Sequence, residues 1–340
     1  MNPHEKKIED IEPGQPWDVD LFRPEDAEGV VKLFHTVYGD GYPVRTFIDP
    51  ALLIEENRTG RTISSVARTP KGEIVGHNAL FNSAPWDRLK ESGAGLVHPL
   101  YRGGKGLFTK MIVHGQDVAA KKFGVQAIFG ESVCNHLFSQ RSTNSLGWIA
   151  AALEVDLMPA AAYSKEGSAA GRVSAVLTSK NLISRPHAVY LPERYAEALN
   201  FIYQGLDDPR ELRVSTEAPP EADTEIGAKV YDFAQVARMT VSQVGRGFPA
   251  TFDAEEKKAL AQGVRVIQVW LKLTWPWVGR IVEELRGRGF FLGGVLPRWF
   301  DADGLLMQKL LDPPGWDAIQ MELERSLKIK EMVKADWAGL

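Results

Sequence analysis

The chain has 340 residues, of which 44% are hydrophobic and 25% charged, and its formal net charge is −4. This length suits one large or two ordinary globular domains. The slightly acidic balance gives no reason to expect nucleic acid as a partner. Cys134 is the single cysteine, which excludes an intramolecular disulfide and a metal site built from several cysteines.

The N-terminal segment is polar and charged, so we expect residues 1–16 to form a loose arm rather than a signal peptide. No apolar run has the length of a membrane span. These two observations predict a soluble, cytoplasmic protein with no membrane partner.

The first half of the chain alternates between patterns typical of strands and of helices. Pro24 begins a helix with an apolar stripe, and Gly147 is a typical helix stop. In chain order we predict a strand at 18–23, a helix that ends at 39–43, a hairpin of strands 62–68 and 73–81, a strand at 93–98, a helix at 105–123, a strand at 126–134, a helix at 136–146, and strands at 148–157 and 172–178.

A glycine-rich basic turn separates the strand at 93–98 from the helix that follows it. The turn contains Arg102, Gly103, Gly104, Lys105 and Gly106. A glycine turn at a helix start presents free N–H groups to one point, and the helix dipole adds partial positive charge. The pattern therefore predicts a phosphate site, although an ordinary basic strand-to-helix turn is the alternative. It matches neither a Walker loop nor a dinucleotide fingerprint.

The element order, the string VHPLYRGGKGLF and Leu146-Gly147-Trp148 together resemble the GNAT superfamily of N-acetyltransferases over residues 17–180. The resemblance implies an α/β (α+β) fold with a mixed, largely antiparallel sheet flanked by helices. The chain departs from the superfamily pattern by one extra glycine and by Phe108 in place of the last glycine. The residues that the resemblance assigns to acetyl-CoA or another acyl-CoA are Leu96, Val97, His98, Arg102, Gly103, Gly104, Lys105, Gly106, Leu107 and Phe108, with Asn135 and Ser139 beside the CoA arm.

Glu131 and His136 are the candidate catalytic residues. An amine must lose a proton before or while it attacks a thioester, and a carboxylate or imidazole can accept that proton. The alternatives are a hydrogen bond within the sheet for Glu131 and a helix-start role for His136. Many superfamily members have a Tyr as acid for the leaving thiolate, but the matching position here is Thr143. We expect Cys134 to be a small buried residue, and no metal site.

The second half resembles the first in one place. Arg288-Gly289-Phe290 follows a predicted strand and helix, as Leu146-Gly147-Trp148 does, which indicates an internal repeat. Gly245-Arg246-Gly247 precedes Phe248-Pro249, which would keep a phosphate from approaching the backbone closely.

We therefore predict an arm at 1–16, a catalytic domain at 17–205 and a degenerate GNAT-like domain at 206–340. We further predict a link at 209–225, a strand at 228–244, a helix at 253–262, a strand at 264–273, a helix at 276–286, strands at 290–296 and 304–311, and a helix at 316–337.

These observations favour an acyl-CoA-dependent N-acyltransferase. The predicted reaction is direct attack, in a ternary complex, by an amine of a small molecule or peptide. The protein would act as a monomer or homodimer. Two alternatives stay open: a non-catalytic protein that senses acyl-CoA or binds a partner, and acyl transfer to a hydroxyl or a carrier protein.

Overall fold

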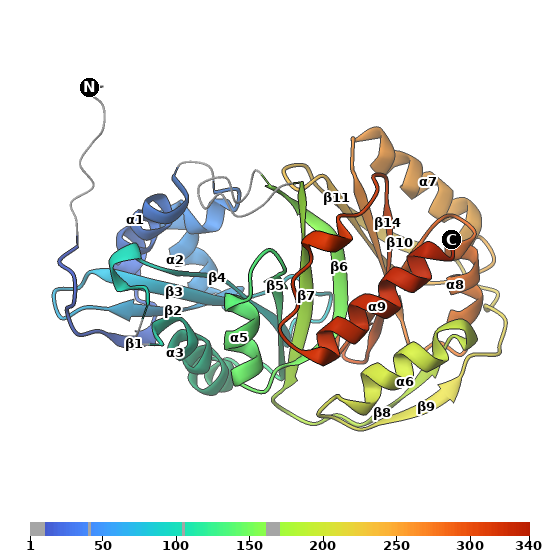
Figure 1. Cartoon of the computed structure of the whole chain (residues 1–340), viewed down its shortest axis with the longest axis horizontal. Coiled ribbons are helices and arrows are strands. Elements are labelled where there is room, and N and C mark those ends of the chain that lie inside the picture. The colour runs from blue at the N-terminus through green and yellow to red at the C-terminus, as the bar shows by residue number, and fades with distance from the viewer. Residues whose placement is uncertain (1–10, 40–41, 104–105, 161–170) are drawn as a thin grey trace. The chain divides into compact units, whose positions relative to one another are not determined.

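The computed structural model describes residues 11–39, 42–103, 106–160 and 171–340, and these form two compact units (Figure 1). Unit 1 comprises the described residues within 1–83 and 90–128. Unit 2 comprises residues 84–89 and the described residues within 129–340.

Unit 1 is built on an antiparallel sheet with the strand order β1-β2-β3-β4. Its strands are β1 (Asp18–Leu21), β2 (Thr62–Arg68), β3 (Ile74–Phe81) and β4 (Leu89–Val97). Its helices are α1 (Ala27–Tyr38), α2 (Pro50–Arg58), α3 (Leu107–His114) and α4 (Ala120–Lys122). A π-helical turn at Gly115–Ala119 joins α3 to α4, so one helix runs from Leu107 to Lys122.

Successive side chains along a strand point to opposite faces of the sheet, and unit 1 has a hydrophobic core on each face. Val66 and Ile74 pack with α1 residues such as Phe34, whereas the neighbouring Ala67 and Val75 pack with α3 residues. Helix α3 lies close to β3 because Gly76 has no side chain: a Cβ there would be 2.5 Å from Leu107 Cδ2. Figure 1 shows α1 and α3 on opposite sides of these strands.

Unit 2 contains most of β5 and everything after it. Its longer elements are β5 (Ala127–Val133), α5 (Phe138–Ser145), β6 (Ile149–Pro159), β7 (Arg172–Asn181), β8 (His187–Leu191), α6 (Ala196–Gln204), β9 (Arg210–Val214), β10 (Glu225–Tyr231), β11 (Val236–Gln243), α7 (Phe248–Ala261), β12 (Val266–Lys272), α8 (Val278–Arg286), β13 (Phe291–Leu296), β14 (Gly304–Leu310) and α9 (Glu324–Ala338).

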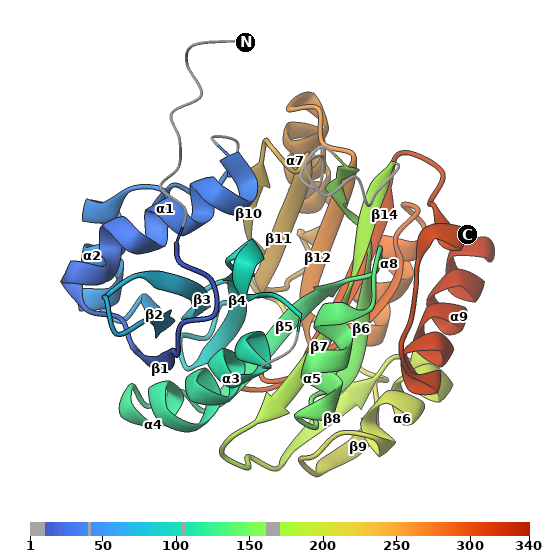
Figure 2. The same ribbon diagram turned by 60° about the vertical axis from the view of Figure 1, so that its left-hand side comes forward.

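The main sheet of unit 2 has the order β5-β7-β6-β13-β14-β12-β11-β10. The pairs β6–β7, β6–β13, β13–β14, β12–β14 and β10–β11 are antiparallel, and β11–β12 is parallel. In both β5-β7-β6 and β12-β14-β13, the strand that comes last in the chain lies between the other two. Helix α9 packs on β6 and β13 with α6 beside it (Figure 2).

The observed fold confirms the predicted class, a mixed and largely antiparallel sheet flanked by helices. Two predictions for the second half are wrong. Residues 209–225 are more than a link, because Arg210–Val214 forms β9 in a parallel ladder with β8. Residues 228–244 are two strands rather than one, since the chain turns between Tyr231 and Val236 with Gln235 at a positive φ of 54°.

The compact units divide the chain differently from the predicted domains at 17–205 and 206–340. Strand β6 pairs with both β7 and β13, so strands from either side of residue 205 share one sheet in unit 2. The boundary at 205 stays a prediction. Within the described parts of the chain, no helix is long and apolar enough to cross a membrane.

Candidate functional site

The predicted site residues divide between the two units. Unit 1 holds Leu96, Val97, His98, Arg102, Gly103, Gly106, Leu107 and Phe108, and unit 2 holds Glu131, Asn135, His136 and Ser139. Gly104 and Lys105 lie outside the described residues.

Strand β4 carries a β-bulge just before the predicted thioester-binding residues. Gly93 is opposite Ala79 and Leu96 is opposite His77, so Ala94 and Gly95 together face Asn78. Ala94 has a positive φ of 49°, which is uncommon for a residue other than glycine. A bulge leaves one residue of the bulged strand out of the ladder. The strand therefore has main-chain polar groups here that the ladder with β3 does not use.

A buried imidazole holds this bulge in place. His77 is fully buried, and its Nδ1 lies 2.9 Å from the Ala94 carbonyl oxygen while its Nε2 lies 3.0 Å from Ser64 Oγ. The carbonyl can only accept, so Nδ1–H donates to it and Nε2 accepts from the Ser64 hydroxyl. Burial lowers the pKa of His77 to about 4. The ring is therefore neutral at physiological pH and has one donor and one acceptor, both in use.

Two described glycines, Gly103 and Gly106, come just before the long helix. Gly103 and Gly106 have positive φ values of 80° and 61°, and among the described residues no atom lies within 4 Å of a Cβ built on either. No side chain of the described residues caps the first amides of α3. Uncapped amides at a helix N-terminus favour an anion. Exposed Arg102 places its Nε 3.1 Å from the Val97 carbonyl oxygen at the end of β4.

The apolar residues of the predicted set point into the protein rather than into solvent. Leu96 and Leu107 are buried in the two cores of unit 1. The ring of Phe108 lies against Gly95, where a Cβ would be 2.6 Å from Phe108 Cε2. Any contact of Leu96 or Leu107 with a ligand would therefore come from the backbone. Phe108, the departure from the superfamily pattern, packs on the bulge.

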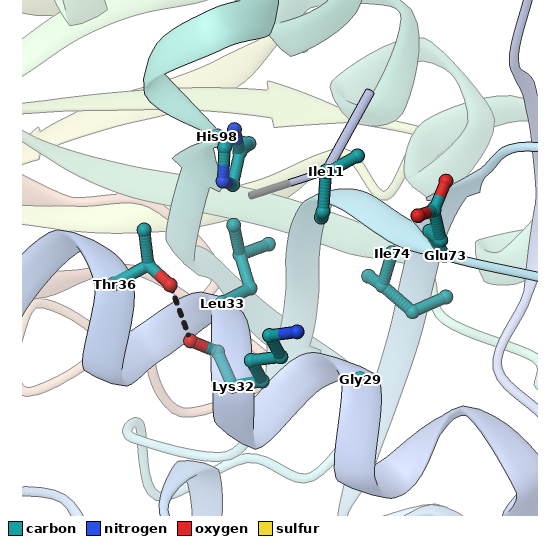
Figure 3. A pocket seen from close by; sticks show the side chains of 8 residues that line it. All are labelled: Ile11, Gly29, Lys32, Leu33, Thr36, Glu73, Ile74 and His98. Carbon is teal, nitrogen blue, oxygen red and sulfur yellow. Dashed lines mark hydrogen bonds between the residues drawn. The ribbon is translucent and has the colours of Figure 1, made fainter. Parts of the chain in front are cut away.

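His98 has a structural role at the end of β4. Its Nδ1 accepts from the Leu100 amide at 3.3 Å and caps the short helical turn Pro99–Tyr101. Its ring also lines a cavity of about 80 Å³ between α1 and β3, together with side chains that include Lys32, Leu33 and Glu73 (Figure 3). This cavity has room for a few water molecules but is far below the roughly 300 Å³ of small-molecule pockets.

Glu131 belongs to a largely buried charged network that the sequence did not predict. Its Oε1 lies 2.8 Å from Arg238 Nη2, and Glu154 Oε1 lies 3.2 Å from the same nitrogen. Gln268 accepts from Arg238 Nε at 2.8 Å and donates to Glu154 Oε1 at 2.8 Å. The Glu131 and Arg238 side chains are 14% and 10% exposed. Four strands of unit 2, β5, β6, β11 and β12, supply one member each.

A sequence signal for this network exists, although it is incomplete. Glu154 and Gln268 are buried polar residues with an apolar residue on each side in their strands, and such residues need buried partners. The partners come from far along the chain: Glu131 and Arg238 are 107 residues apart. Periodicity alone does not identify pairs at that separation.

The residues after β5 form a second polar group in unit 2. His136 Nδ1 and Ser139 Oγ are buried atoms with no hydrogen-bond partner among the described residues. The Asn135 carbonyl accepts from Gln320 Nε2 at 3.1 Å. Thr143 Oγ1 donates to the Ser139 and Gln140 carbonyls, at 3.2 and 3.1 Å, within α5. The Thr143 hydroxyl is thus occupied by its own helix.

Cys134 is buried, which confirms the expectation from the sequence. It is 1% exposed, and burial raises the pKa of its thiol to about 12. At neutral pH the side chain is therefore a thiol rather than a nucleophilic thiolate. Within the described parts of the chain, no three His, Cys, Asp or Glu side chains are grouped so that they could hold a metal ion.

Comparison with known proteins finds similarity only among solved structures. No family model matches the sequence, and no curated protein matches it. An N-acetyltransferase from Staphylococcus aureus Mu50 is 14% identical, with a TM-score of 0.41 over 49% of this chain and 99% of its own. Ribosomal-protein-S5-alanine acetyltransferase from Vibrio fischeri is 16% identical, with a TM-score of 0.40 over 48% and 92%. The GNAT family N-acetyltransferase YhbS from Escherichia coli, in complex with CoA, is 18% identical, with a TM-score of 0.30 over 41% and 72%.

Proposed function

We propose that this protein is an acyl-CoA-dependent N-acyltransferase that uses acetyl-CoA or another short acyl-CoA. The observation that carries the proposal is the N-terminus of α3, as far as its residues are described. No described atom lies within 4 Å of a Cβ built on Gly103 or Gly106, no described side chain caps the first amides of the helix, and Arg102 adds positive charge. A pyrophosphate suits such a site because helix-end amides and a guanidinium both bind phosphate oxygens.

Strand β4, which precedes the turn, also supports an acyl-CoA as the acyl donor. The bulge at Ala94 and Gly95 comes directly before Leu96 and Val97 in β4, and His77 fixes its position through the Ala94 carbonyl. Backbone N–H groups held in this way would stabilise the oxyanion that forms when a thioester carbonyl is attacked. We assign this role to the backbone of Leu96 and Val97.

The proposed chemistry is a single acyl transfer. The acceptor amine attacks the thioester carbonyl carbon, the new C–N bond forms and the C–S bond breaks. We assign proton uptake from the amine to Glu131, directly or through water, with His136 as the second candidate. The thiolate of CoA is then protonated from solvent, because Thr143 donates within its own helix. The acceptor is a small-molecule or peptide amine.

We further propose that the two halves of the chain are GNAT-like repeats. Both β5-β7-β6 and β12-β14-β13 place the last strand between the other two. Their helices end alike: Trp148 N–H donates to the Thr143 carbonyl, Phe290 N–H donates to the Leu285 carbonyl, both at 3.1 Å, and the glycine before each has a positive φ. The repeats would correspond to the predicted domains at 17–205 and 206–340.

The second repeat has no open turn at the matching place. Its α7 begins after Gly245-Arg246-Gly247, and Gly245 lies so close to Ala222 that a Cβ would overlap the Ala222 carbonyl oxygen. Thr224 Oγ1 accepts from the Gly245 amide at 3.0 Å, and Glu221 forms an ion pair with Arg246. The chain's own segment 221–224 thus packs against Gly245 and Arg246, just before α7. We propose a single donor site per chain.

An assay of thiol release from acetyl-CoA in the presence of a panel of primary amines tests the proposed activity. We expect amine-dependent release by the wild type and a loss of roughly tenfold or more in kcat/KM for Gly106→Val, which crowds the turn. Gly124→Val is the matched control, because Gly124 follows the same helix with a φ of 67° and open space around it. Tight binding of CoA without release on any amine would support the non-catalytic alternative instead.

A further inference from the structure

Strand β9 forms one edge of the small two-stranded sheet in unit 2. Among the described residues it pairs with β8 alone, in a parallel ladder. Figures 1 and 2 both show β9 at the bottom of the view, beside β8 and α6. The edge of a sheet offers main-chain N–H and C=O groups to any further strand that can align with them.

The main-chain groups that β9 turns outward belong to its even-numbered residues. Along a strand, the N–H and C=O groups of successive residues point to opposite sides. Ser215, directly after β9, donates its N–H to the Leu191 carbonyl of β8 at 3.0 Å, so every second residue back from Ser215 faces β8. Leu212 and Val214 lie between these residues and direct their main-chain groups away from β8, where no other described strand pairs with them.

At this edge the apolar side chains lie on one face of the strand and the exposed charges on the other. Leu212 and Val214 are 38% and 62% exposed, although Val189, which lies beside Leu212 on β8, is fully buried. The side chains of Glu211 and Arg213 are 66% and 47% exposed, and they form an ion pair of 3.0 Å with each other. An apolar row that is buried on β8 therefore reaches solvent on β9.

We propose that β9 pairs with β9 of a second copy of this chain, antiparallel about a two-fold axis at Leu212. Because its main-chain groups point outward, Leu212 forms a hydrogen-bonded pair with the Leu212 of the other copy. The residues on either side then form pairs without hydrogen bonds, in which side chains lie closest together. Glu211 of each copy thus faces Arg213 of the other, and the two exposed leucines meet on the opposite face.

The charges of β9 select this register. A shift by two residues keeps outward main-chain groups opposite each other, but it places Glu211 against Glu211, or Arg213 against Arg213, of the other copy. Like charges directly opposite destabilise a strand pair. This self-complementarity favours a second copy over an unrelated strand. Five residues per copy are too few to bury the roughly 1,200 Å² of a stable interface, so we expect a weak dimer with a Kd of about 100 μM.

Sedimentation velocity of the full chain, from well below to well above this Kd, measures the association. We expect a monomer–dimer equilibrium in the wild type. Glu211→Arg and Arg213→Glu should each weaken self-association about tenfold or more, because like charges then face each other. An equimolar mixture of the two variants should associate about as tightly as the wild type, since each cross-strand pair of the mixed dimer joins opposite charges.

The mixture separates contact between copies from loss of the ion pair within one chain, which mixing cannot restore. Lys229→Glu is the matched control, because Lys229 is an exposed charge on β10, the end strand of the main sheet of unit 2, and it should leave the dimer unchanged. A wild type that is monomeric throughout, charge variants that associate like the wild type, or no recovery in the mixture would overturn the proposal. Loss of association in Lys229→Glu would place the contact at β10 and overturn it as well. None of these measurements uses a substrate, so their outcome is independent of the proposed acyl transfer.

Discussion

His77 is a residue of unit 1 whose protonation state affects the fold. It is fully buried, and burial lowers its pKa from 6.5 to about 4. Its two ring nitrogens connect Ser64 to the bulge at Ala94, and the edges of the ring face Phe34 and Phe47. A second proton on this ring would remove the acceptor that the Ser64 hydroxyl needs.

The shift in the His77 pKa predicts a pH dependence of stability. Between pH 6.5 and about 4 the unfolded chain binds a proton that the folded chain does not, so stability is complete above this range and falls as the pH falls through it. We expect His77 to cost about 2 kcal/mol of unfolding free energy on going from pH 7 to pH 5. Urea titrations at the two pH values measure this.

The variant His77→Asn separates this residue from the other acid-sensitive groups. Asparagine has an amide donor and carries no titrating group, so the difference between the two pH values should shrink by about 2 kcal/mol. If the unfolding free energy changes equally between pH 7 and pH 5 in the wild type and in His77→Asn, His77 is not the source of the pH dependence.

At the level of single elements, α2 shows how a local signal can define a helix. Asp49 accepts from the amides of Ala51 and Leu52 at 3.0 and 3.1 Å, and Pro50 occupies the first helical position. We expect Asp49→Ala to lower the unfolding free energy by about 1 kcal/mol, measured by urea denaturation, whereas Asp49→Asn should stay close to the wild type because it keeps the acceptor. Equal losses in the two variants would point to charge rather than capping.

Elements with a strong local pattern could be predicted from sequence. Apolar spacing marks the helix from Leu107, and a glycine marks the helix stop at Gly147, where the structure has a positive φ of 72°. Helix α2 went unpredicted even though Asp49-Pro50 is a typical start signal. Strand β9 has no such local pattern, since its five residues are held by a ladder with β8 rather than by a core of their own.

The candidate site could be predicted only where it is local. The turn at 102–106 is contiguous, so glycine content and charge indicated it. The bulge at Ala94 depends on the register between β3 and β4, and Arg238 reaches Glu131 only through sheet topology. Both features arise from pairings between strands, which periodicity within one strand does not encode.

At the scale of the whole chain, the two proposed repeats meet at Gly294. This residue of β13 lies opposite Ala152 of β6, with a φ of +132° that favours glycine. A Cβ at Gly294 would lie 2.6 Å from Ala152 Cα and overlap the Ala151 carbonyl oxygen. The pairing of β6 with β13 therefore requires glycine here.

We expect Gly294→Ala to lower the unfolding free energy by roughly 3 kcal/mol, because neither backbone can yield without breaking the pair. Gly227→Ala in β10 is the matched control, since no described atom lies within 4 Å of a Cβ at that position. It should be neutral or slightly stabilising. Thermal or urea unfolding measures both variants, and similar losses in the two would contradict the account of this joint.

The central claim is that the turn at Arg102–Phe108 binds the pyrophosphate of an acyl-CoA. Isothermal titration with acetyl-CoA tests it most directly. The account predicts one molecule bound per chain, affinity that falls about tenfold or more in Gly106→Val, and affinity close to the wild type in Gly124→Val. No binding by the wild type, or equal affinity in the two glycine variants, would contradict it.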